Sequence, residues 1–343
     1  MTDRPVVGIT MGDPAGIGPE IIIKALCRQD LYEVCRPVVL GDRNILSVAC
    51  SSLGFDADSR VRINGISSPS MSKGVFKEID VVSLSDLSPG AVMPGKPTVA
   101  GGRAMVTYIV KAVRMIQFHE LDAMVTCPIN KALMHEAGYD YEGHTQLIAE
   151  LTDTDDYVMM LAGKKLRVTL VTIHCALRDV PDLISREAVY NTIRITDMAL
   201  RTDFAIENPR IAVAALNPHA GEDGLFGAEE EDIIRPAIKM ALHDGSFVYG
   251  PFPPDTLFFR AASSEFDAVV AMYHDQGLIP LKLMHFSDAV NVTLGLPVIR
   301  TSVDHGTAYD IAGKGKADPS SLVEAIRLAA CMKENRASRQ TCL

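Results

Sequence analysis

The sequence predicts an α/β fold with two α/β domains, and three observations support this prediction. The chain has 343 residues, of which 48% are hydrophobic, and this length suits two domains of about 100 to 200 residues each. Short apolar runs alternate with segments of helical periodicity in the order strand, turn and helix. Several apolar runs stop abruptly at glycine or ionisable residues, which is typical of central parallel strands whose carboxyl ends open onto a crevice.

The composition argues against several classes of protein. The net charge is -10 and no basic run is present, so we expect no nucleic-acid partner, and an anionic ligand requires a local cationic pocket. Seven cysteines without a C-x-x-C spacing indicate reduced thiols. The N-terminus lacks the pattern of a signal peptide, and no apolar run approaches the roughly 20 residues of a membrane helix. We therefore expect a soluble cytoplasmic protein.

The first predicted elements are a strand over residues 5–10, a glycine-rich turn with the sequence MGDPAGIGPE, and a helix over residues 20–29. The glycine spacing differs from the G-x-G-x-x-G dinucleotide fingerprint. The turn is therefore either a tight strand-to-helix connection or a backbone loop that lines an active cleft. The next predicted elements are strands 36–40, 61–63, 79–84 and 122–126, with helices 44–53 and 101–118.

Two short polar segments follow the strand over residues 122–126. Lys131, in the segment CPINK, either faces a ligand or begins a solvated helix. His144 and Thr145 precede an amphipathic helix over residues 146–152. Because unpaired backbone N–H groups point outward at a helix N-terminus, this His-Thr pair can hold an anion.

Three histidines follow three predicted apolar strands, which cover residues 167–173, 210–216 and 266–272. The carboxyl ends of parallel strands meet at one edge of an α/β sheet, so we expect these histidines to lie together. Imidazole ligands suit Zn, Co or Ni better than Mg. The sequence therefore predicts a three-histidine metal site made of His174, His219 and His274.

The last third of the chain carries further candidates. Asp255, in the loop GPFPPDTLF, is either a substrate contact or acid/base group, or a turn cap. Lys282, Asn291 and Arg300 are polar residues among apolar ones and predict part of an anion site. The glycine-containing loop after Arg300 predicts a cofactor site.

These motifs resemble one enzyme family. The segments GDPAGIGPE, GHT, LNPHAGE, GPFPPDTLF, AMYHDQGLIPLK and NVTLGLPVIRTSVDHGTAYDIAGKGKADP closely resemble the 4-hydroxythreonine-4-phosphate dehydrogenase family, including its D-threonate/D-erythronate 4-phosphate dehydrogenase branch. The resemblance runs from about residue 8 to about residue 333. The first and last of these motifs are also similar, more distantly, to the isocitrate and isopropylmalate dehydrogenases.

The resemblance implies two isocitrate/isopropylmalate dehydrogenase-like α/β domains flanking a cleft, and a homodimer whose active site is completed at the interface. We expect a cofactor-side domain over residues 1–125 plus 292–343, and a metal-binding and dimerisation domain over residues 126–291. The metal ligands would be His174, His219 and His274, with His274 reaching the partner's site. The substrate-binding residues implied by the resemblance are His144, Thr145, Lys282, Asn291 and Arg300. The cofactor-binding residues it implies are His305, Gly306, Thr307, Ala308, Asp310, Ile311, Ala312 and Asp318.

The chain departs from the biosynthetic enzymes of this family at two motifs. It reads TIHCALR where they have THLPLRD, and GHTQ where they have GHTE, while its IPLK run looks more like the threonate branch. The substrate expected from the resemblance is thus D-threonate 4-phosphate, D-erythronate 4-phosphate or 4-phosphohydroxy-L-threonine.

The reaction implied by the resemblance is NAD-dependent oxidative decarboxylation with one divalent metal, Zn, Co, Ni, Mn or Mg. The catalytic base is left open among Lys282, Asp255 and a metal-bound water. Two alternatives are a cis-dihydrodiol dehydrogenase of an aromatic carboxylate and a metallohydrolase. The loop DHGTAYDIAGKG argues against the hydrolase, which has no use for it, and the strand-end histidines argue against a non-catalytic binding protein.

Overall fold

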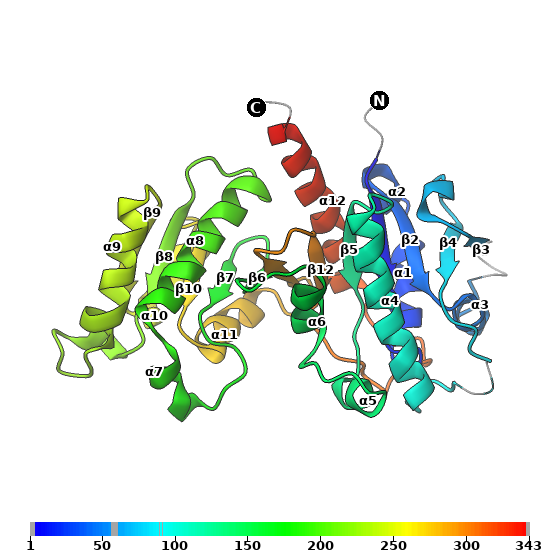
Figure 1. Ribbon diagram of the computed structural model, residues 1–343, viewed down its shortest axis with the longest axis horizontal. Helices are drawn as coiled ribbons and strands as arrows, with labels where there is room; N and C mark the ends of the chain where they lie inside the picture. Colours follow the sequence, from blue (N-terminus) through cyan, green and yellow to red (C-terminus); the bar gives the residue numbers. More distant parts are fainter. Residues whose placement is uncertain (1–3, 56–60, 89, 91, 341–343) are drawn as a thin grey trace. The chain divides into compact units, whose positions relative to one another are not determined.

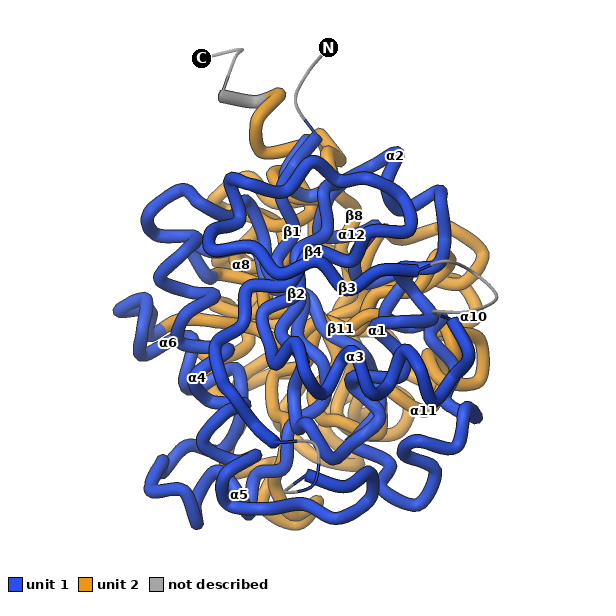
Figure 2. Tube along the Cα trace, turned by 90° about the vertical axis from the view of Figure 1, so that its right-hand side faces the viewer, with its two compact units in different colours: residues 1–155, 296–334 blue, residues 156–295, 335–343 orange. Residues whose placement is uncertain are grey.

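The computed structural model describes residues 4–55, 61–88, 90 and 92–340 of the chain (Figure 1). The chain divides into two compact units, which Figure 2 shows in blue and orange. Unit 1 comprises residues 1–155 and 296–334, and unit 2 comprises residues 156–295 and 335–343. Each unit contains a sheet with helices, so the predicted α/β fold class is confirmed.

The compact units divide the chain at 155/156 and 295/296, whereas the predicted domains divide it at 125/126 and 291/292. Helices α5 (Lys131–Glu136) and α6 (His144–Leu151) account for the larger difference, because both pack against α4 (Val99–Gln117) of unit 1. The segment from residue 126 to residue 155 thus shares its hydrophobic contacts with unit 1.

The sheet of unit 1 has the strand order β3-β4-β2-β1-β5-β12. Neighbouring strands in this order are parallel throughout. The strands are β1 (Val6–Thr10), β2 (Arg36–Gly41), β3 (Arg62–Ile66), β4 (Glu78–Ser83), β5 (Ala123–Thr126) and β12 (Arg300–Val303).

The register of these strands brings several loops to one edge of the sheet. Thr10, at the end of β1, pairs with Leu40 of β2 and with Thr126 of β5. Thr126 in turn pairs with Ser302 of β12. The glycine turn, the segment after β5 and the loop after β12 therefore leave the sheet at the same carboxyl edge, where ligands bind in α/β folds.

The helices of unit 1 pack on this sheet and on one another. Helix α4 packs against β1, β2 and β5, and α3 packs against α1, β3 and β4. Asp42 caps α3 by accepting hydrogen bonds from the N–H groups of Asn44 (2.9 Å) and Ile45 (3.2 Å). The remaining helices are α1 (Gly18–Leu26), α2 (Leu31–Val34), α3 (Arg43–Ser52), the short 3-10 helix η1 (Pro69–Met71) and α12 (Ser320–Gln340), which continues into unit 2.

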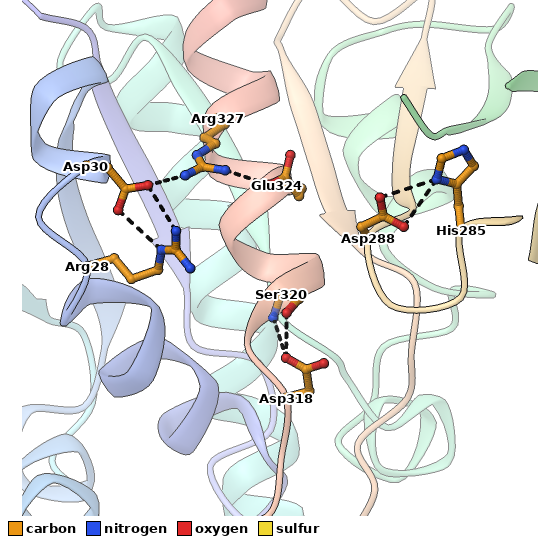
Figure 3. A network of polar contacts seen from close by, with 8 residues as sticks. All are labelled: Arg28, Asp30, His285, Asp288, Asp318, Ser320, Glu324 and Arg327. Atoms are coloured by element: carbon orange, nitrogen blue, oxygen red, sulfur yellow. Dashed lines mark hydrogen bonds and ion pairs between the residues drawn. The ribbon is translucent and has the colours of Figure 1, made fainter. Parts of the chain in front are cut away.

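Polar contacts join α12 to the N-terminal part of unit 1 (Figure 3). The guanidinium of Arg327 donates to Glu324 of its own helix (2.6 Å) and pairs with Asp30, which also accepts from Arg28. All four side chains are partly exposed, so such pairs contribute only about 1 kcal/mol or less each. Burial of the apolar face of α12, including Leu322, Ile326 and Ala329, contributes more.

The sheet of unit 2 has the strand order β11-β6-β7-β10-β8-β9 and is mixed. The pairs β11–β6 and β6–β7 are antiparallel, and the pairs β7–β10, β10–β8 and β8–β9 are parallel. The strands are β6 (Val158–Ala162), β7 (Arg167–Leu170), β8 (Arg210–Ala214), β9 (Phe247–Phe252), β10 (Ala268–Ala271) and β11 (Val290–Leu294).

The three strands predicted to end at histidines are shorter than expected. Strands β7, β8 and β10 end at Leu170, Ala214 and Ala271, so the histidines follow after short irregular segments. The reason is that apolar residues continue beyond the ladder. Ile173, for example, lies outside β7 but packs on the core of unit 2, where buried apolar contact does not require strand pairing.

The helices of unit 2 surround this sheet, and buried residues from β7, β8, β10, α10 and α11 form its core. His285 is buried and stabilises the β6–β7 hairpin. Its Nε2 accepts a hydrogen bond from the N–H of Lys165 (3.3 Å), and its Nδ1 contacts Asp288 (3.2 Å; Figure 3). The helices are η2 (Leu177–Asp179), α7 (Val180–Leu183), α8 (Arg186–Thr202), η3 (Pro218–Gly221), η4 (Glu230–Ile234), α9 (Arg235–His243), α10 (Pro254–Ala262) and α11 (His274–Met284).

No helix within the described part of the chain combines the length and the apolar character needed to cross a membrane.

Gly12 should be intolerant of a side chain. Its φ is +71°, and a Cβ atom there would lie 2.3 Å from the carbonyl oxygen of Pro128. Gly54 has a similar φ of +77° with nothing within 4 Å of an added Cβ. We expect Gly54→Ala to lower the free energy of unfolding by about 1 to 2 kcal/mol for the left-handed backbone alone.

Gly12→Ala should cost at least about 2 kcal/mol more, because the methyl group overlaps backbone that cannot move freely. Denaturant unfolding of the two variants and the wild type measures this difference. Equal losses in the two variants would show that the Pro128 contact is not rigid.

Candidate active site

In unit 1 the glycine turn and the loop after β12 form one joined structure. The N–H of Ile17 donates to the carbonyl of Thr307 (3.0 Å), and an added Cβ on Gly16 would lie 3.1 Å from the same oxygen. Glu20, which is 3% exposed, accepts from the N–H groups of Ala317 (2.8 Å) and Gly315 (3.2 Å). The turn is therefore a strand-to-helix connection that also holds the predicted cofactor loop in place.

A buried polar network crosses this junction. The Tyr309 hydroxyl donates to Asp13 (2.5 Å) and accepts from the side-chain amide of Asn130 (2.8 Å), while Asp13 also accepts from the N–H of Ala15 (2.9 Å). Burial raises the pKa of Asp13, and the hydrogen bonds from Tyr309 and Ala15 oppose that rise. Burial and the bond to Asp13 raise the pKa of Tyr309 to about 12, so this hydroxyl keeps its proton. The network fixes the loop to the segment after β5.

The predicted cofactor residues lie along this loop. His305 contacts the carbonyl of Gly306 through Nδ1 (3.2 Å), and its Nε2 is buried without a hydrogen-bond partner. Asp318 accepts from the N–H and the hydroxyl of Ser320 (2.9 and 2.6 Å; Figure 3), so it caps the start of α12. An apolar pocket lies beside the loop, between the glycine turn, α3 and Gly313.

Two predicted substrate residues of unit 1, Arg300 and His144, interact electrostatically. Arg300 is 3% exposed, and its guanidinium donates to the hydroxyl of Thr126 (2.9 and 3.2 Å). Burial lowers the pKa of Arg300 to about 10, which leaves it protonated at neutral pH. His144 begins α6, and its Nε2 is buried without a hydrogen-bond partner. Burial, followed by the charges of Arg300 and Lys131, holds the pKa of His144 well below 6.5, so it is neutral.

The other predicted substrate residues occupy separate places. Thr145 follows His144 in α6, in unit 1. In unit 2, Lys282 is half-buried in α11, and Asn291 lies in β11 with a buried Oδ1 that has no hydrogen-bond partner. Asp255 is exposed and lies in the first turn of α10.

In unit 2, two of the three predicted metal ligands lie together. His174 and His274 line one pocket of about 540 Å³, and their ring centroids are 5.8 Å apart. The Nδ1 of His274 contacts Asp275 (2.7 Å), an arrangement that orients an imidazole ligand. His219 is exposed on η3 and is absent from the pocket lining. Within the described residues of one chain, no three His, Cys, Asp or Glu side chains form a ready metal site.

The loop that carries His219 has an unusual backbone. All six residues from 219 to 224 have positive φ, four of them non-glycine, a conformation that costs roughly 1 kcal/mol or more at each non-glycine position. Glu230, which is 1% exposed, stabilises the base of the loop by accepting from the N–H groups of Leu216 and Asn217, each at 2.8 Å. The Asn217 amide donates to Glu229 (2.7 Å) and Glu230 (3.0 Å).

Comparison with known proteins places the chain in a family. Residues 33–329 match the family model described as pyridoxal phosphate biosynthetic protein PdxA. The chain belongs to the PdxA family. It is 53% identical to a 4-hydroxythreonine-4-phosphate dehydrogenase of Desulforapulum autotrophicum over 96% of both chains. It is 46% identical to a D-threonate 4-phosphate dehydrogenase of Cupriavidus necator, over 97% of this chain and 98% of the relative.

A solved PdxA-family structure agrees with the fold. The 4-hydroxythreonine-4-phosphate dehydrogenase of Klebsiella pneumoniae aligns with a TM-score of 0.87 and 42% identity, over 96% of this chain and all of that one. The predicted family and the predicted dehydrogenase-type oxidoreductase are therefore confirmed.

Sequence reasoning missed several residues that organise these sites in the PdxA-family chain: Asp13, Thr126, Asn130, Glu230 and Tyr309. Three of them, Asp13, Asn130 and Tyr309, lay within segments that the sequence analysis already marked. Glu230 carried no such signal, because it stands among other acidic residues in the run AEEED.

The pH dependence of stability should report the neutral state of His144. Above about pH 6.5 the imidazole is neutral in both the folded and the unfolded chain. Below that pH His144 becomes protonated in the unfolded chain but stays neutral in the folded chain, because folding lowers its pKa. The free energy of unfolding is therefore at its full value above the pKa that His144 has in the unfolded chain. It decreases as the pH falls from that value toward the pKa that His144 has in the folded chain.

His144→Gln should remove this loss, which amounts to at most about 1.4 kcal/mol per pH unit. Denaturant unfolding between about pH 7 and about pH 5 measures it, with His135→Gln, at an exposed position of α5, as the matched control. Parallel curves for His144→Gln and the wild type would contradict the buried, neutral assignment.

Proposed function

We propose that this PdxA-family protein is an NAD-dependent and divalent-metal-dependent dehydrogenase that oxidises and decarboxylates a 4-phosphorylated four-carbon hydroxy acid. The observation that carries the proposal is the full-length similarity to relatives named for 4-hydroxythreonine-4-phosphate and D-threonate 4-phosphate. A buried cation beside a neutral histidine in an acidic protein supports an anionic substrate.

Unsatisfied polar atoms support the assignment of the substrate residues. A buried polar atom without a partner costs roughly 1 to 3 kcal/mol unless a ligand satisfies it. His144 Nε2 and Asn291 Oδ1 are two such atoms. Together with Thr145, Lys282 and Arg300 they would bind the phosphate, carboxylate and hydroxyl groups of the substrate.

The loop from His305 to Asp318 would bind NAD. The buried, unpartnered Nε2 of His305 supports this assignment, because a ligand acceptor or donor would satisfy it. The apolar pocket between the glycine turn, α3 and Gly313 suits a flat aromatic ring such as adenine. The hydrogen bonds of Glu20 and Asp13 would keep the loop ready for the cofactor.

The metal would be held by His174, His219 and His274. The imidazoles of His174 and His274 around one pocket support a divalent ion such as zinc. We extend the proposal to a homodimer whose active site is completed at the interface. Within one chain His274 shares a pocket with His174, so this pairing is not the support for a role of His274 in the partner's site. A bound metal would lower the pKa of the substrate hydroxyl and polarise the carbonyl that replaces it. We extend the proposal to an isocitrate/isopropylmalate dehydrogenase-like cleft between the two domains.

In the proposed reaction the carbon that bears the 3-hydroxyl loses a hydride to NAD, and the hydroxyl loses its proton to a base. The 3-oxo acid then releases carbon dioxide from C1. Lys282, which is half-buried, and Asp255, which is exposed, remain the candidate bases among the side chains. Arg300 and His144 would hold the anionic part of the substrate throughout, which keeps the reacting carbon in place.

The activity itself can be tested with the purified protein, NAD and a divalent metal. We expect reduced nicotinamide to form with 4-phospho-D-threonate, 4-phospho-D-erythronate or 4-phosphohydroxy-L-threonine. The matched acids without phosphate should react at least about tenfold less efficiently, because they lose a charge-assisted contact. No reduced nicotinamide with any of the three phosphorylated acids would overturn the proposed function, whereas hydrolysis without reduction of NAD would favour the metallohydrolase.

Replacing His219 with alanine tests the metal site. The side chain is exposed, so the fold should survive, whereas activity should fall at least about a hundredfold because a metal is worth several kcal/mol of transition-state stabilisation. His243→Ala, at another exposed position of unit 2, is the matched control. Activity and bound metal are measured for both variants, and full metal content with full activity in His219→Ala would contradict the assignment.

A further inference from the structure

We propose that Lys24 is a positioning residue for the cofactor loop, and that Lys24 and Glu20 together keep this loop in the shape that binds the cofactor. We call these two side chains of α1 the Lys24–Glu20 clamp. The inference deepens the proposed function and rests on it, because it concerns the binding of NAD by the loop from His305 to Asp318.

The clamp binds both polar backbone groups of two loop residues. The ammonium of Lys24 donates to the carbonyl oxygens of Gly315 (2.9 Å) and Ala317 (2.7 Å). The carboxylate of Glu20 accepts from the N–H groups of the same two residues, at 3.2 and 2.8 Å. Lys24 also donates to Glu20 (2.8 Å), which joins the two halves of the clamp. The end of the loop is thus bound through four backbone groups by side chains of one helix.

The hydrogen-bonding capacity of the Lys24 ammonium is fully used. An ammonium group has three donors, and its three acceptors here are Glu20 and the two loop carbonyls. The side chains of Lys24 and Glu20 are 19% and 3% exposed, so the clamp is largely shielded from water. An ordinary i,i+4 ion pair supports only its own helix. This pair instead joins α1 to residues almost three hundred positions later, which indicates a role in shaping the loop.

Two contacts from the N-terminal part of unit 1 hold the loop at both ends. The N–H of Ile17 donates to the carbonyl of Thr307 near the beginning of the loop, and the clamp binds its end. Between these anchors lies Gly313, which lines the apolar pocket together with Glu20. A Cβ atom added to Gly313 would lie 2.7 Å from the side chain of Pro94, so the loop passes close to that wall of the pocket. A change in the path of the loop therefore changes the shape of the pocket.

The clamp would act on NAD by holding the loop ready in advance. Lys24 is absent from the pocket lining, so its effect on the cofactor passes through the loop. Without the ammonium, the carbonyls of Gly315 and Ala317 lose the donor that they share. The loop then spends a smaller fraction of time in the shape that binds the cofactor, and the apparent affinity falls in proportion to that fraction.

Binding of NAD to the full-length protein is the first measurement. We expect Lys24→Met to raise the Kd for NAD by about tenfold in calorimetry, as for the loss of a charge-assisted hydrogen bond. Lys24→Arg should recover part of the affinity, because a guanidinium also donates to carbonyl and carboxylate oxygens.

Arg201→Met in α8 is the matched control. Arg201 also pairs with an acid four residues earlier, Asp197 (2.8 Å), and donates to the backbone carbonyl of Glu207 (2.7 Å) in the segment that follows its helix. The substitution thus removes the same kind of anchor in unit 2, and this variant should bind NAD like the wild type.

Hydrogen exchange and kinetics separate positioning of the loop from a general loss of stability. The amides of Gly315 and Ala317, followed by mass spectrometry, should exchange faster in Lys24→Met and at the wild-type rate in Arg201→Met. The KM for NAD should rise about tenfold in Lys24→Met with little change in kcat, because binding is lost equally from the ground state and the transition state. The KM for the phosphorylated acid should stay unchanged.

The outcomes distinguish failure of the inference from failure of the proposed function. Equal affinities of Lys24→Met and the wild type for NAD would overturn the inference, even with faster exchange in the loop, and would leave the proposed function intact. An equal rise in the KM for the acid would also overturn it, because the substitution would then disturb more than the loop. A wild-type protein that binds no NAD would contradict both the inference and the proposed cofactor.

Discussion

Two buried carboxylates, Asp13 and Glu20, determine how unit 1 is assembled. They lie in the glycine turn and at the start of α1, and their hydrogen-bond partners Tyr309 and Ala317 lie almost three hundred residues later. A buried carboxylate is costly unless it is hydrogen-bonded, so these contacts are obligatory once the turn is buried. The loop proposed to bind the cofactor therefore takes its shape from the first strand-turn-helix unit of the chain.

The charge balance of the protein bears on the proposed anion site. The chain carries a net charge of -10, so the proposed anionic substrate would meet an unfavourable field at long range. A guanidinium buried at Arg300 and hydrogen-bonded to the Thr126 hydroxyl acts at short range, where water does not screen it. Keeping His144 neutral avoids a further desolvated positive charge in that site.

The positions of His174, His219 and His274 in unit 2 depend on the register of the sheet. The parallel pairing of β7, β10 and β8 brings the segments after these strands to one edge, as parallel strands require. His174 and His274 then share a pocket, whereas His219 follows a left-handed loop that Glu230 stabilises. A strained loop supported by a buried acid is typical of functional sites, where backbone strain is offset by surrounding hydrogen bonds.

The sequence by itself determined the α/β class, the family, most strands of unit 1 and the residue types at each strand end, because apolar runs and glycine turns are local signals. It did not determine where the strands stop, because apolar residues such as Ile173 pack on the core beyond the ladder. Nor did it show the antiparallel β6 or the bonds of Asp13, Glu20 and Glu230. Only tertiary structure decides these, because sheet register and buried hydrogen bonds join residues far apart in sequence, and no local pattern records such pairing.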